Sequence, residues 1–402
     1  MNSKRIAVLS YHTCPLSDEK NAEVGGMNTY VLELSKALSQ KGYQIDIYTR
    51  SVDTNSPQVV NINPNLRVVH LLAGKPAPVS KKQLIRFIPE FIDNFNKFMK
   101  EEKLSYDLIN AHYYLSGLIG LQLKKRLNVP LFMTFHTLAL MKNLVEKQED
   151  YQRIEYETLL VKNSDKIIAT SEADLEYIHT LYGCPLKKIS ILTPGVDLKV
   201  FRPLEKKQAK QAIKASLNHK LILFVGRIVP LKGIDSLLYA MKILTKRNPK
   251  LTICLWIIGE ESKESKRLIL LRNLLKINTF VKFIGKISNQ DLPNYYNAAE
   301  VLVLPSQYES FGITALEAMA CGVPVVITDA TGVSNLLDKK HSSLLTSASN
   351  PIMLARKINH LLTDNIEHQK MSREVAKKVQ DLSWENIADE FIALCKHRIQ
   401  EI

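Results

Sequence analysis

Residues 220–244 read KLILFVGRIVPLKGIDSLLYAMKIL, and this stretch decides the fold. It starts with a continuous apolar run, passes through a turn that contains Pro230 and Gly233, and continues with apolar residues at helical spacing. A short apolar run without polar alternation is typical of a strand that is buried on both faces. Because such a strand here leads directly into a helix, the stretch predicts a parallel sheet covered by helices.

The same alternation runs through the rest of the chain. A helix is predicted at residues 27–42, with Gly42 at its C-terminal cap. Further strands are predicted at residues 5–10, 44–49, 66–72, 107–112, 130–135, 166–171, 189–194, 251–260, 281–286, 301–305 and 324–328. The segment 194–207 carries two prolines and a glycine, which suits a hinge. We therefore expect an α/β fold of two Rossmann-like domains that face each other across a cleft, with ligands beyond the carboxyl ends of the strands.

Length and composition limit the class of protein. The 402 residues exceed what one core usually organises, and 46% hydrophobic and 23% charged residues are typical of well-packed domains. The five cysteines include no CxxC pair, so we expect neither a metal site nor a disulfide framework, and a cytoplasmic location. The apolar stretch at the start is too short for a signal peptide, and no run of about 18 apolar residues predicts a membrane span.

The formal net charge of +14 favours anionic ligands and permits peripheral docking on an anionic membrane. No basic run is interleaved with aromatic residues, so nucleic acid is not an expected partner. An oligomer is compatible with the sequence.

Two short segments suggest an anion site. Gly25 and Gly26 stand between the first strand region and the first helix, where they either let a ligand approach the backbone or form an ordinary tight turn. Arg227 and Lys232 flank the proline-containing turn after a buried strand. An arginine fork and a mobile lysine charge at the start of a helix suit a diphosphate.

The segment ESFGITALE (309–317) carries two carboxylates. In one continuous helix they would lie about 12 Å apart, at about 1.5 Å per residue. Glycoside hydrolases need about 5 to 9.5 Å between their carboxylates, so a hydrolytic pair is disfavoured. We expect Glu309 in a loop, backbone N–H groups of Phe311 and Gly312 at the helix start, and Glu317 facing the cleft. Two exposed helix carboxylates remain the alternative.

Three histidines, His12, His112 and His136, stand at the ends of predicted strands of the first domain. Their spacing does not bring them into one metal coordination sphere. Each is either a hydrogen-bond donor toward a ligand or a buried histidine with satisfied hydrogen bonds.

Together these motifs resemble the retaining nucleotide-sugar glycosyltransferases of family four, which have the GT-B fold. The likeness covers nearly the whole chain, in the family's order: residues 25–50, 169–178, 191–201, 225–235 and 305–326. The resemblance implies that Arg227 and Lys232 hold the donor diphosphate and that Glu317 holds the nucleoside ribose. It also implies that Glu309, with the backbone of Phe311 and Gly312, holds the donor sugar.

By the same resemblance His136 contacts the donor sugar from the first domain. We therefore expect His136, Arg227, Lys232 and Glu309 at the reaction centre, and Gly25 and Gly26 beside the donor. One departure stands out, since Thr331-Gly332-Val333 and residues 338–345 replace glycine-rich turns of the family. The back of the donor pocket is therefore expected to differ.

Within the family, SYHTCPL (10–16), AHYYLSG (111–117) and TFHTLALMKN (134–143) look most like the D-inositol-3-phosphate glycosyltransferases, to which sucrose-phosphate synthase is related. This resemblance implies a site for the acceptor phosphate. Its matching residues are Asn28, Lys81, Tyr113, Thr137 and Arg153. A lysine, an arginine and hydroxyls can jointly neutralise a phosphomonoester.

The expected activity is retaining transfer of a hexosyl group from a nucleoside diphosphate sugar, most simply a UDP-sugar, to a small phosphorylated polyol or sugar. No cofactor is expected beside this co-substrate. Residues 1–195, with the helix 384–402 packed back on them, would bind the acceptor, and residues 196–383 the donor. Closure about the hinge would exclude water. A lipid or polysaccharide acceptor at a membrane, a nucleotide-sugar epimerase and a catalytically silent binding protein remain alternatives.

Overall fold

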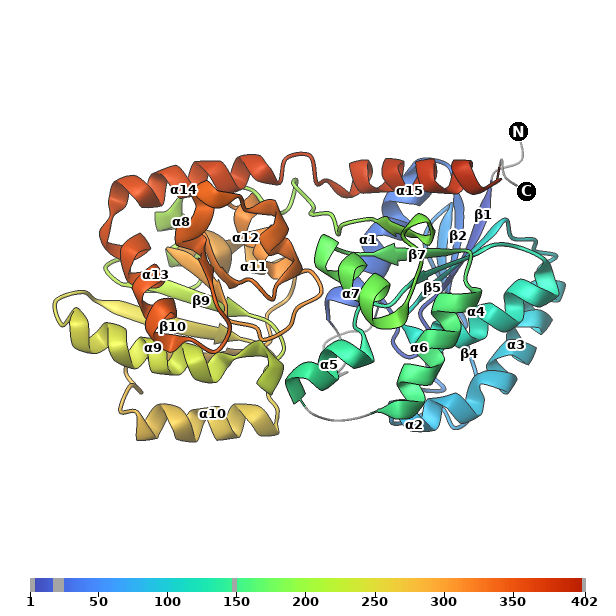
Figure 1. Cartoon of the computed structure of the whole chain (residues 1–402), viewed down its shortest axis with the longest axis horizontal. Helices are drawn as coiled ribbons and strands as arrows, with labels where there is room; N and C mark the ends of the chain where they lie inside the picture. Colours follow the sequence, from blue (N-terminus) through green and yellow to red (C-terminus); the bar gives the residue numbers. More distant parts are fainter. Residues whose placement is uncertain (1–3, 17–24, 147–149, 400–402) are drawn as a thin grey trace. The chain divides into compact units, whose positions relative to one another are not determined.

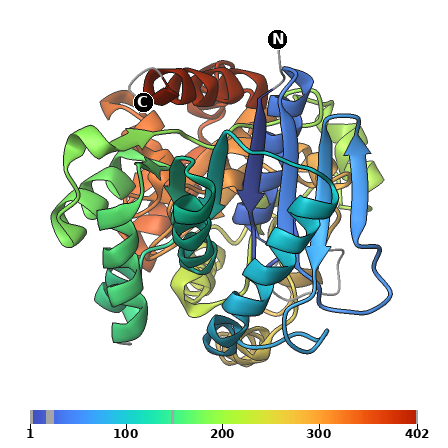
Figure 2. The same ribbon diagram turned by 90° about the vertical axis from the view of Figure 1, so that its right-hand side faces the viewer.

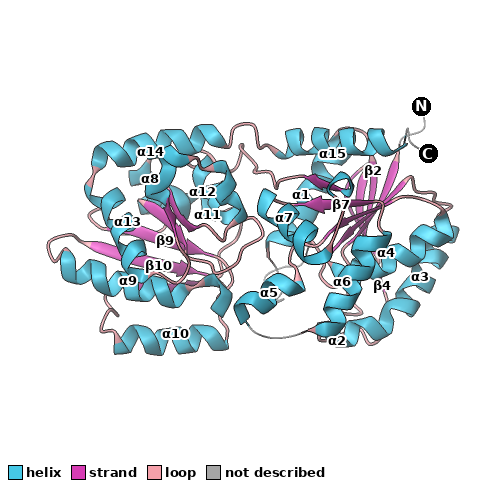
Figure 3. Ribbon diagram, in the orientation of Figure 1, coloured by secondary structure: helices cyan, strands magenta, loops and turns pink. Residues whose placement is uncertain are grey.

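The computed structural model describes residues 4–16, 25–146 and 150–399. The chain divides into two compact units. Unit 1 comprises residues 1–193 and 387–402, and unit 2 comprises residues 194–386. The sequence predicts the corresponding boundaries after residues 195 and 383, two and three residues from those of the structure. Both units are α/β layers with helices on the faces of a central sheet (Figure 3).

The sheet of unit 1 has eight strands in the order β3-β4-β2-β1-β5-β6-β7-β8 (Figure 1). Figure 2 shows the neighbouring blue strands β1 and β2, which pair in parallel. The strands are β1 (Arg5–Leu9), β2 (Gln44–Arg50), β3 (Val59–Asn63), β4 (Leu66–Leu71), β5 (Leu108–His112), β6 (Leu131–Thr134), β7 (Lys166–Ala169) and β8 (Ile189–Ile191). The order reverses between β1 and β5, because the chain builds outward from β1 and then returns to build on its other side.

Amphipathic helices connect these strands. They are α1 (Gly26–Gln40), α2 (Lys81–Leu84), α3 (Ile88–Glu101), α4 (Tyr114–Leu127), α5 (Ala139–Glu146), α6 (Tyr151–Asn163) and α7 (Glu172–Tyr182). The last helix, α15 (Trp384–Ile399), packs on this unit through Phe391, whose ring lies 6.0 Å from that of Phe132 in β6. An ion pair between Asp389 and Lys41, at the end of α1, places α15 beside α1.

The sheet of unit 2 has six strands in the order β11-β10-β9-β12-β13-β14, all parallel. The strands are β9 (Lys220–Val225), β10 (Ile253–Ile258), β11 (Val281–Gly285), β12 (Val301–Leu304), β13 (Val325–Thr328) and β14 (Leu345–Thr346). The helices are α8 (Lys206–Ala212), α9 (Ile234–Arg247), α10 (Lys263–Leu274), α11 (Leu292–Ala298), α12 (Ile313–Ala320), α13 (Pro351–Thr363) and α14 (Asn365–Lys378). Here the order reverses between β9 and β12.

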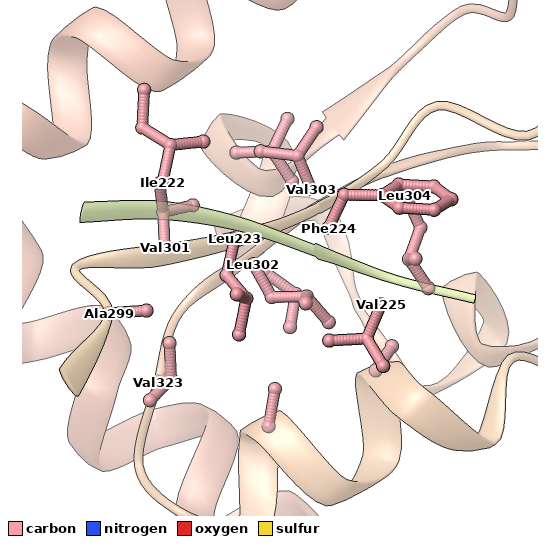
Figure 4. Close-up of a cluster of buried hydrophobic side chains, with 14 of the residues drawn as sticks. Ile222, Leu223, Phe224, Val225, Ala299, Val301, Leu302, Val303, Leu304 and Val323 are labelled. Atoms are coloured by element: carbon pink, nitrogen blue, oxygen red, sulfur yellow. The ribbon is translucent and has the colours of Figure 1, made fainter. Parts of the chain in front are cut away.

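The core of unit 2 explains why its strands read as unbroken apolar runs. Residues 221–225 of β9 and 301–304 of β12 are all buried, and their side chains interleave with those of Ala299 and Val323 (Figure 4). Both faces of a parallel sheet are covered by helices, so neither face leaves room for alternating polar residues.

The α/β class with two doubly wound units is confirmed, and every predicted strand is present within one to four residues at its ends. Two strands were not predicted. The edge strand β3 pairs antiparallel to β4, and β14 has only two residues. Their patterns are weak because β3 is half exposed and lies between Pro57 and Pro64, while β14 is too short to show a period.

The predicted hinge, residues 194–207, contacts the segment that precedes α15 through its backbone. The amide of Val196 donates to the carbonyl of Leu382, and Val196 forms a parallel bridge with Ser383. A Cβ on Gly195 would come within 2.9 Å of the Trp384 backbone. Glycine is therefore required at residue 195 for this close approach of two backbones.

Candidate functional site

The site in unit 2 lies where the strand order reverses. In open parallel sheets, ligands bind beyond the carboxyl ends of the strands at such a point. The loop after β9 (226–233) and the loop after β12 (305–312) leave neighbouring strands there, and the amide of Gln307 donates to the carbonyl of Leu231 at 2.8 Å. Arg227 and Lys232 come from the first loop and Glu309 from the second. The fold thus brings these three predicted residues to one edge.

Gly233 makes the contact between these loops possible. Its backbone has φ 65°, and a Cβ there would lie 2.0 Å from the carbonyl oxygen of Pro305. The residue closes a 3-10 turn at Pro230–Lys232 and is the N-terminal cap of α9. A side chain at this position would therefore push apart the loops that carry Lys232 and Glu309.

Lys232 and Glu309 form an ion pair, with side-chain exposures of 15% and 22%. Burial, and then the positive charge of Arg227, lower the pKa of Lys232 to about 7, while the ion pair with Glu309 acts in the opposite direction. Arg227 itself is exposed. The arrangement places one mobile cation, one carboxylate and one guanidinium at the start of a helix, which suits an anionic ligand that carries hydroxyl groups.

The backbone after Glu309 is held by residues 330–333. The amide of Glu309 donates to Ala330, Gly332 donates to Glu309, and Val333 donates to the carbonyl of Phe311. Gly312 caps α12 with φ 100°, and a Cβ on it would lie 3.0 Å from the methyl group of Thr331. Phe311 is buried and Gly312 immediately precedes α12, so N–H groups at this helix start are available to a ligand.

Glu317 lies inside the unit rather than on an open surface. It is 6% exposed, and its carboxylate accepts a 2.6 Å hydrogen bond from the hydroxyl of Tyr296 in α11. Burial raises the pKa of Glu317 to about 7, and the hydrogen bond from Tyr296 partly offsets this rise. Two exposed helix carboxylates, the alternative at sequence level, do not describe this segment, because Glu317 is buried and Glu309 lies in a loop.

In unit 1 the corresponding edge lies beyond β1 and β5. Tyr113 follows β5 with φ 73°, a conformation that non-glycine residues rarely adopt. Its ring lies 5.3 Å from the ammonium nitrogen of Lys81 and 5.0 Å from the guanidinium carbon of Arg153. His12, from the loop after β1, lies 4.4 Å from the same ring. Tyr113 is therefore the centre of a cationic cluster.

Arg153 also holds Thr137 in this cluster. Its Nη2 donates to the carbonyl and to Oγ1 of Thr137, at 2.7 and 3.1 Å, and its Nε donates to Glu157 at 2.7 Å. Burial acts to lower the pKa of Arg153, but the buried carboxylate of Glu157 outweighs it and holds that pKa above its ordinary value. The guanidinium thus stays charged in a buried position.

The structure brings together four of the five residues expected to bind a phosphate, namely Lys81, Tyr113, Thr137 and Arg153. The fifth, Asn28, is buried and donates to Oγ1 of Thr13 and to the carbonyl of Cys14. Gly25 caps α1 and Gly26 is its first residue, with the amide of Asn28 donating to Gly25. Residues 17–24, which precede them, lie outside the described chain.

His136 has φ 59°, and its Nε2 lies 2.9 Å from Nδ1 of His112. Burial lowers the pKa of His136 to about 3 and that of His112 well below its usual range. Burial, followed by the charge of Lys81, does the same to the pKa of His12. All three histidines are therefore neutral at pH 7. A hydrogen bond joins His112 to His136, whereas Nδ1 of His12 is buried without a hydrogen-bond partner among the described residues.

Reasoning from the sequence did not identify the residues that hold Arg153 and Glu317 in place, namely Glu157 and Tyr296. Glu157 stands four residues after Arg153 in α6, a spacing that indicates a helical ion pair. Tyr296 comes from a different helix than Glu317 and has no signal in the local sequence.

Among the described residues, no group of three or more His, Cys, Asp or Glu could hold a metal ion. None of the described helices is long and apolar enough to cross a membrane.

Comparison with known proteins decides the family. Residues 24–200 match the model of Glycosyltransferase Family 4, and residues 205–379 match that of Glycosyl transferases group 1. The D-inositol 3-phosphate glycosyltransferase of Corynebacterium urealyticum is 33% identical over 97% of this chain and 95% of its own length. The enzyme of the same name from Corynebacterium efficiens is 30% identical over 97% of this chain and 94% of its own length.

The chain belongs to the family-four type of glycosyltransferases, which includes these D-inositol 3-phosphate glycosyltransferases. Among solved structures, this glycosyltransferase is similar to sucrose-phosphate synthase from Thermosynechococcus elongatus, with 29% identity and a TM-score of 0.91 over 99% of this chain and all of that one. The Anabaena protein HepE, solved with UDP and glucose, shares the fold at 17% identity, with a TM-score of 0.77 over 98% of this chain and all of that one. The expected GT-B architecture is confirmed by these neighbours.

We predict that Gly233→Ala separates the two loops of unit 2. The new Cβ would overlap the Pro305 carbonyl, so we expect a lower melting temperature. Gly183→Ala is the matched control, because Gly183 has nearly the same backbone (φ 66°, ψ 24°) with nothing within 4 Å of the added Cβ. This control should cost only about 1–2 kcal/mol, for the left-handed conformation. Equal melting temperatures in both variants would contradict the prediction.

Proposed function

We propose that this glycosyltransferase transfers a hexosyl group, with retention of configuration, from a UDP-sugar to a hydroxyl of a small phosphorylated polyol or sugar. The main support for a phosphorylated acceptor is a cluster of four residues in unit 1, Lys81, Tyr113, Thr137 and Arg153. Two cations and two hydroxyl-bearing side chains at one sheet edge suit a phosphomonoester. The names of the inositol-phosphate relatives and of sucrose-phosphate synthase support the same class.

In unit 2 we assign the donor. Arg227 and Lys232 would bind the diphosphate and stabilise its charge as it leaves, because cations aimed at developing negative charge lower the barrier. Glu309 and the backbone of Phe311 and Gly312 would hold the sugar hydroxyls, and Glu317 the ribose hydroxyls. We assign a sugar contact to His136, a site beside the donor to Gly25 and Gly26, and an acceptor contact to Asn28. Our scheme uses no metal ion and no cofactor.

A screen of donors and acceptors tests the function. UDP-glucose, UDP-N-acetylglucosamine and GDP-mannose are combined with inositol phosphate, fructose 6-phosphate and glucose phosphates, and nucleotide release is measured. We expect release that requires a phosphorylated acceptor, and a fall of about 10²–10³-fold in Lys232→Ala. The anomeric configuration of the product, read by NMR, tests retention.

Other outcomes of this screen have distinct meanings. An altered sugar formed without acceptor would indicate an epimerase, and turnover only with lipid or polysaccharide would replace the small acceptor. Near-normal turnover in Lys232→Ala would contradict the donor assignment.

We predict that Lys81→Ala raises the KM for the phosphorylated acceptor by about tenfold or more, since it removes a charge-assisted hydrogen bond. The KM for the donor should stay the same. Lys82→Ala is the matched control, because Lys82 is the exposed neighbour of Lys81 in α2. Equal acceptor KM values for the two variants would refute the phosphate site.

We predict that the affinity for UDP-glucose is greatest near pH 7. Below this pH Glu317, with a pKa of about 7, takes up a proton and becomes a weaker acceptor for hydroxyl groups. Above it Lys232, whose pKa is also about 7, loses its charge. Calorimetric titration from pH 5.5 to 8.5 measures both limbs, since this donor has no group that titrates in that range.

Two variants identify which group causes the fall in UDP-glucose affinity on each side of pH 7. Glu317→Gln should remove the fall on the acid side, and Lys232→Arg should remove the fall on the alkaline side, because arginine stays charged. If the fall on the acid side persists in Glu317→Gln, or the fall on the alkaline side persists in Lys232→Arg, another group causes it.

A further inference from the structure

Helix α10 presents an unusual outer face. Leu270 and Leu274, one turn apart, are 64% and 80% exposed. Lys263 and Lys266 are also exposed and lie on the same side of the helix, four to eleven residues before the leucines. We call Lys263, Lys266, Leu270 and Leu274 the α10 face.

The helix itself is a firmly attached part of unit 2. Ser265 and Leu268 on its opposite side are buried, and Ser262 caps its start. Arg267 pairs with Asp235 at the start of α9 and with Glu264. Figure 1 shows α10 lying beside α9, and Leu268 of α10 belongs to the buried core of unit 2. The α10 face is therefore held outward rather than left loose by local unfolding.

Positive charge is concentrated in the part of the sequence that contains α10. Residues 242–286 contain eleven Lys and Arg and three Glu, a net charge of +8 out of +14 for the whole chain. The exposed cations of this stretch are Lys246, Arg247, Lys250, Lys263, Lys266, Arg267, Lys276, Lys282 and Lys286. Of these, Arg267 is neutralised by its own carboxylate partners.

We propose that the α10 face docks this enzyme on the surface of an anionic phospholipid bilayer. The lysines would lie among the anionic headgroups, and the two leucines farther along the same face would enter the boundary with the acyl chains. A soluble polyanion would use the charge but leave the leucines in water, so the combination favours a lipid surface. This inference is independent of the acceptor that the enzyme uses.

The test is co-sedimentation of the full chain with vesicles at fixed ionic strength. Vesicles of phosphatidylcholine and phosphatidylglycerol in equal parts are compared with vesicles of phosphatidylcholine alone. We expect binding to the anionic vesicles only. Lys263→Glu with Lys266→Glu should weaken that binding at least about twentyfold, from about 1 kcal/mol per cation near the surface, and Leu270→Gln with Leu274→Gln should also weaken it.

Two control variants test whether vesicle binding depends on the α10 face itself, or only on the total charge and the exposed apolar residues of the protein. Lys207→Glu with Lys214→Glu makes the same change of charge at exposed positions in and near α8. Ile352→Gln with Ile366→Gln removes two isoleucines that are 64% and 84% exposed elsewhere on unit 2. Both controls should bind like the unchanged protein.

Three results would overturn the proposal: no binding of the unchanged protein to anionic vesicles, equal losses in the α8 and α10 lysine pairs, or no effect of the leucine pair. Transfer to soluble acceptors, measured separately, should be unaffected by either α10 pair. Loss of docking and loss of the proposed activity can therefore be told apart.

Discussion

Burial of a parallel sheet on both faces is the constraint on which the rest of this protein depends. Strands such as β9 and β12 are apolar on both sides because helices cover both faces. The candidate ionisable side chains are therefore absent from these strands and lie in loops and helices beyond the strand ends. In each unit the reversal of strand order leaves room beyond the carboxyl ends, and the candidate residues gather there.

Backbone geometry then decides how close these side chains come. In unit 2 the loops after β9 and β12 approach so closely at Gly233 that a side chain does not fit, and this contact brings Lys232 to Glu309. In unit 1 Tyr113 has a positive φ of 73°, and its ring lies within 5.3 Å of the charged groups of both Lys81 and Arg153. Both sites thus depend on conformations that are costly for ordinary residues and that the surrounding packing must maintain.

Burial also changes what the charged groups can do. Lys232 and Glu317 both have a pKa of about 7, although one is a base and the other an acid, because burial disfavours the charged form of each. Arg153 is buried as deeply, yet it keeps its charge through Glu157. Because a guanidinium stays protonated in proteins, Arg153 is a permanent cation, whereas the pKa of about 7 lets Lys232 respond to its ligand and to pH.

The sequence by itself determined the two doubly wound units, nearly all strands, and the residues worth testing, because apolar runs and glycine turns reflect local burial and backbone freedom. It also placed Arg227, Lys232 and Glu309 in loops after strands. It did not show the burial of Glu317 against Tyr296, or the close approach of the loops after β9 and β12 at Gly233. Only the tertiary structure decided these, because they depend on which distant segments share a surface, and a local pattern carries no information about that.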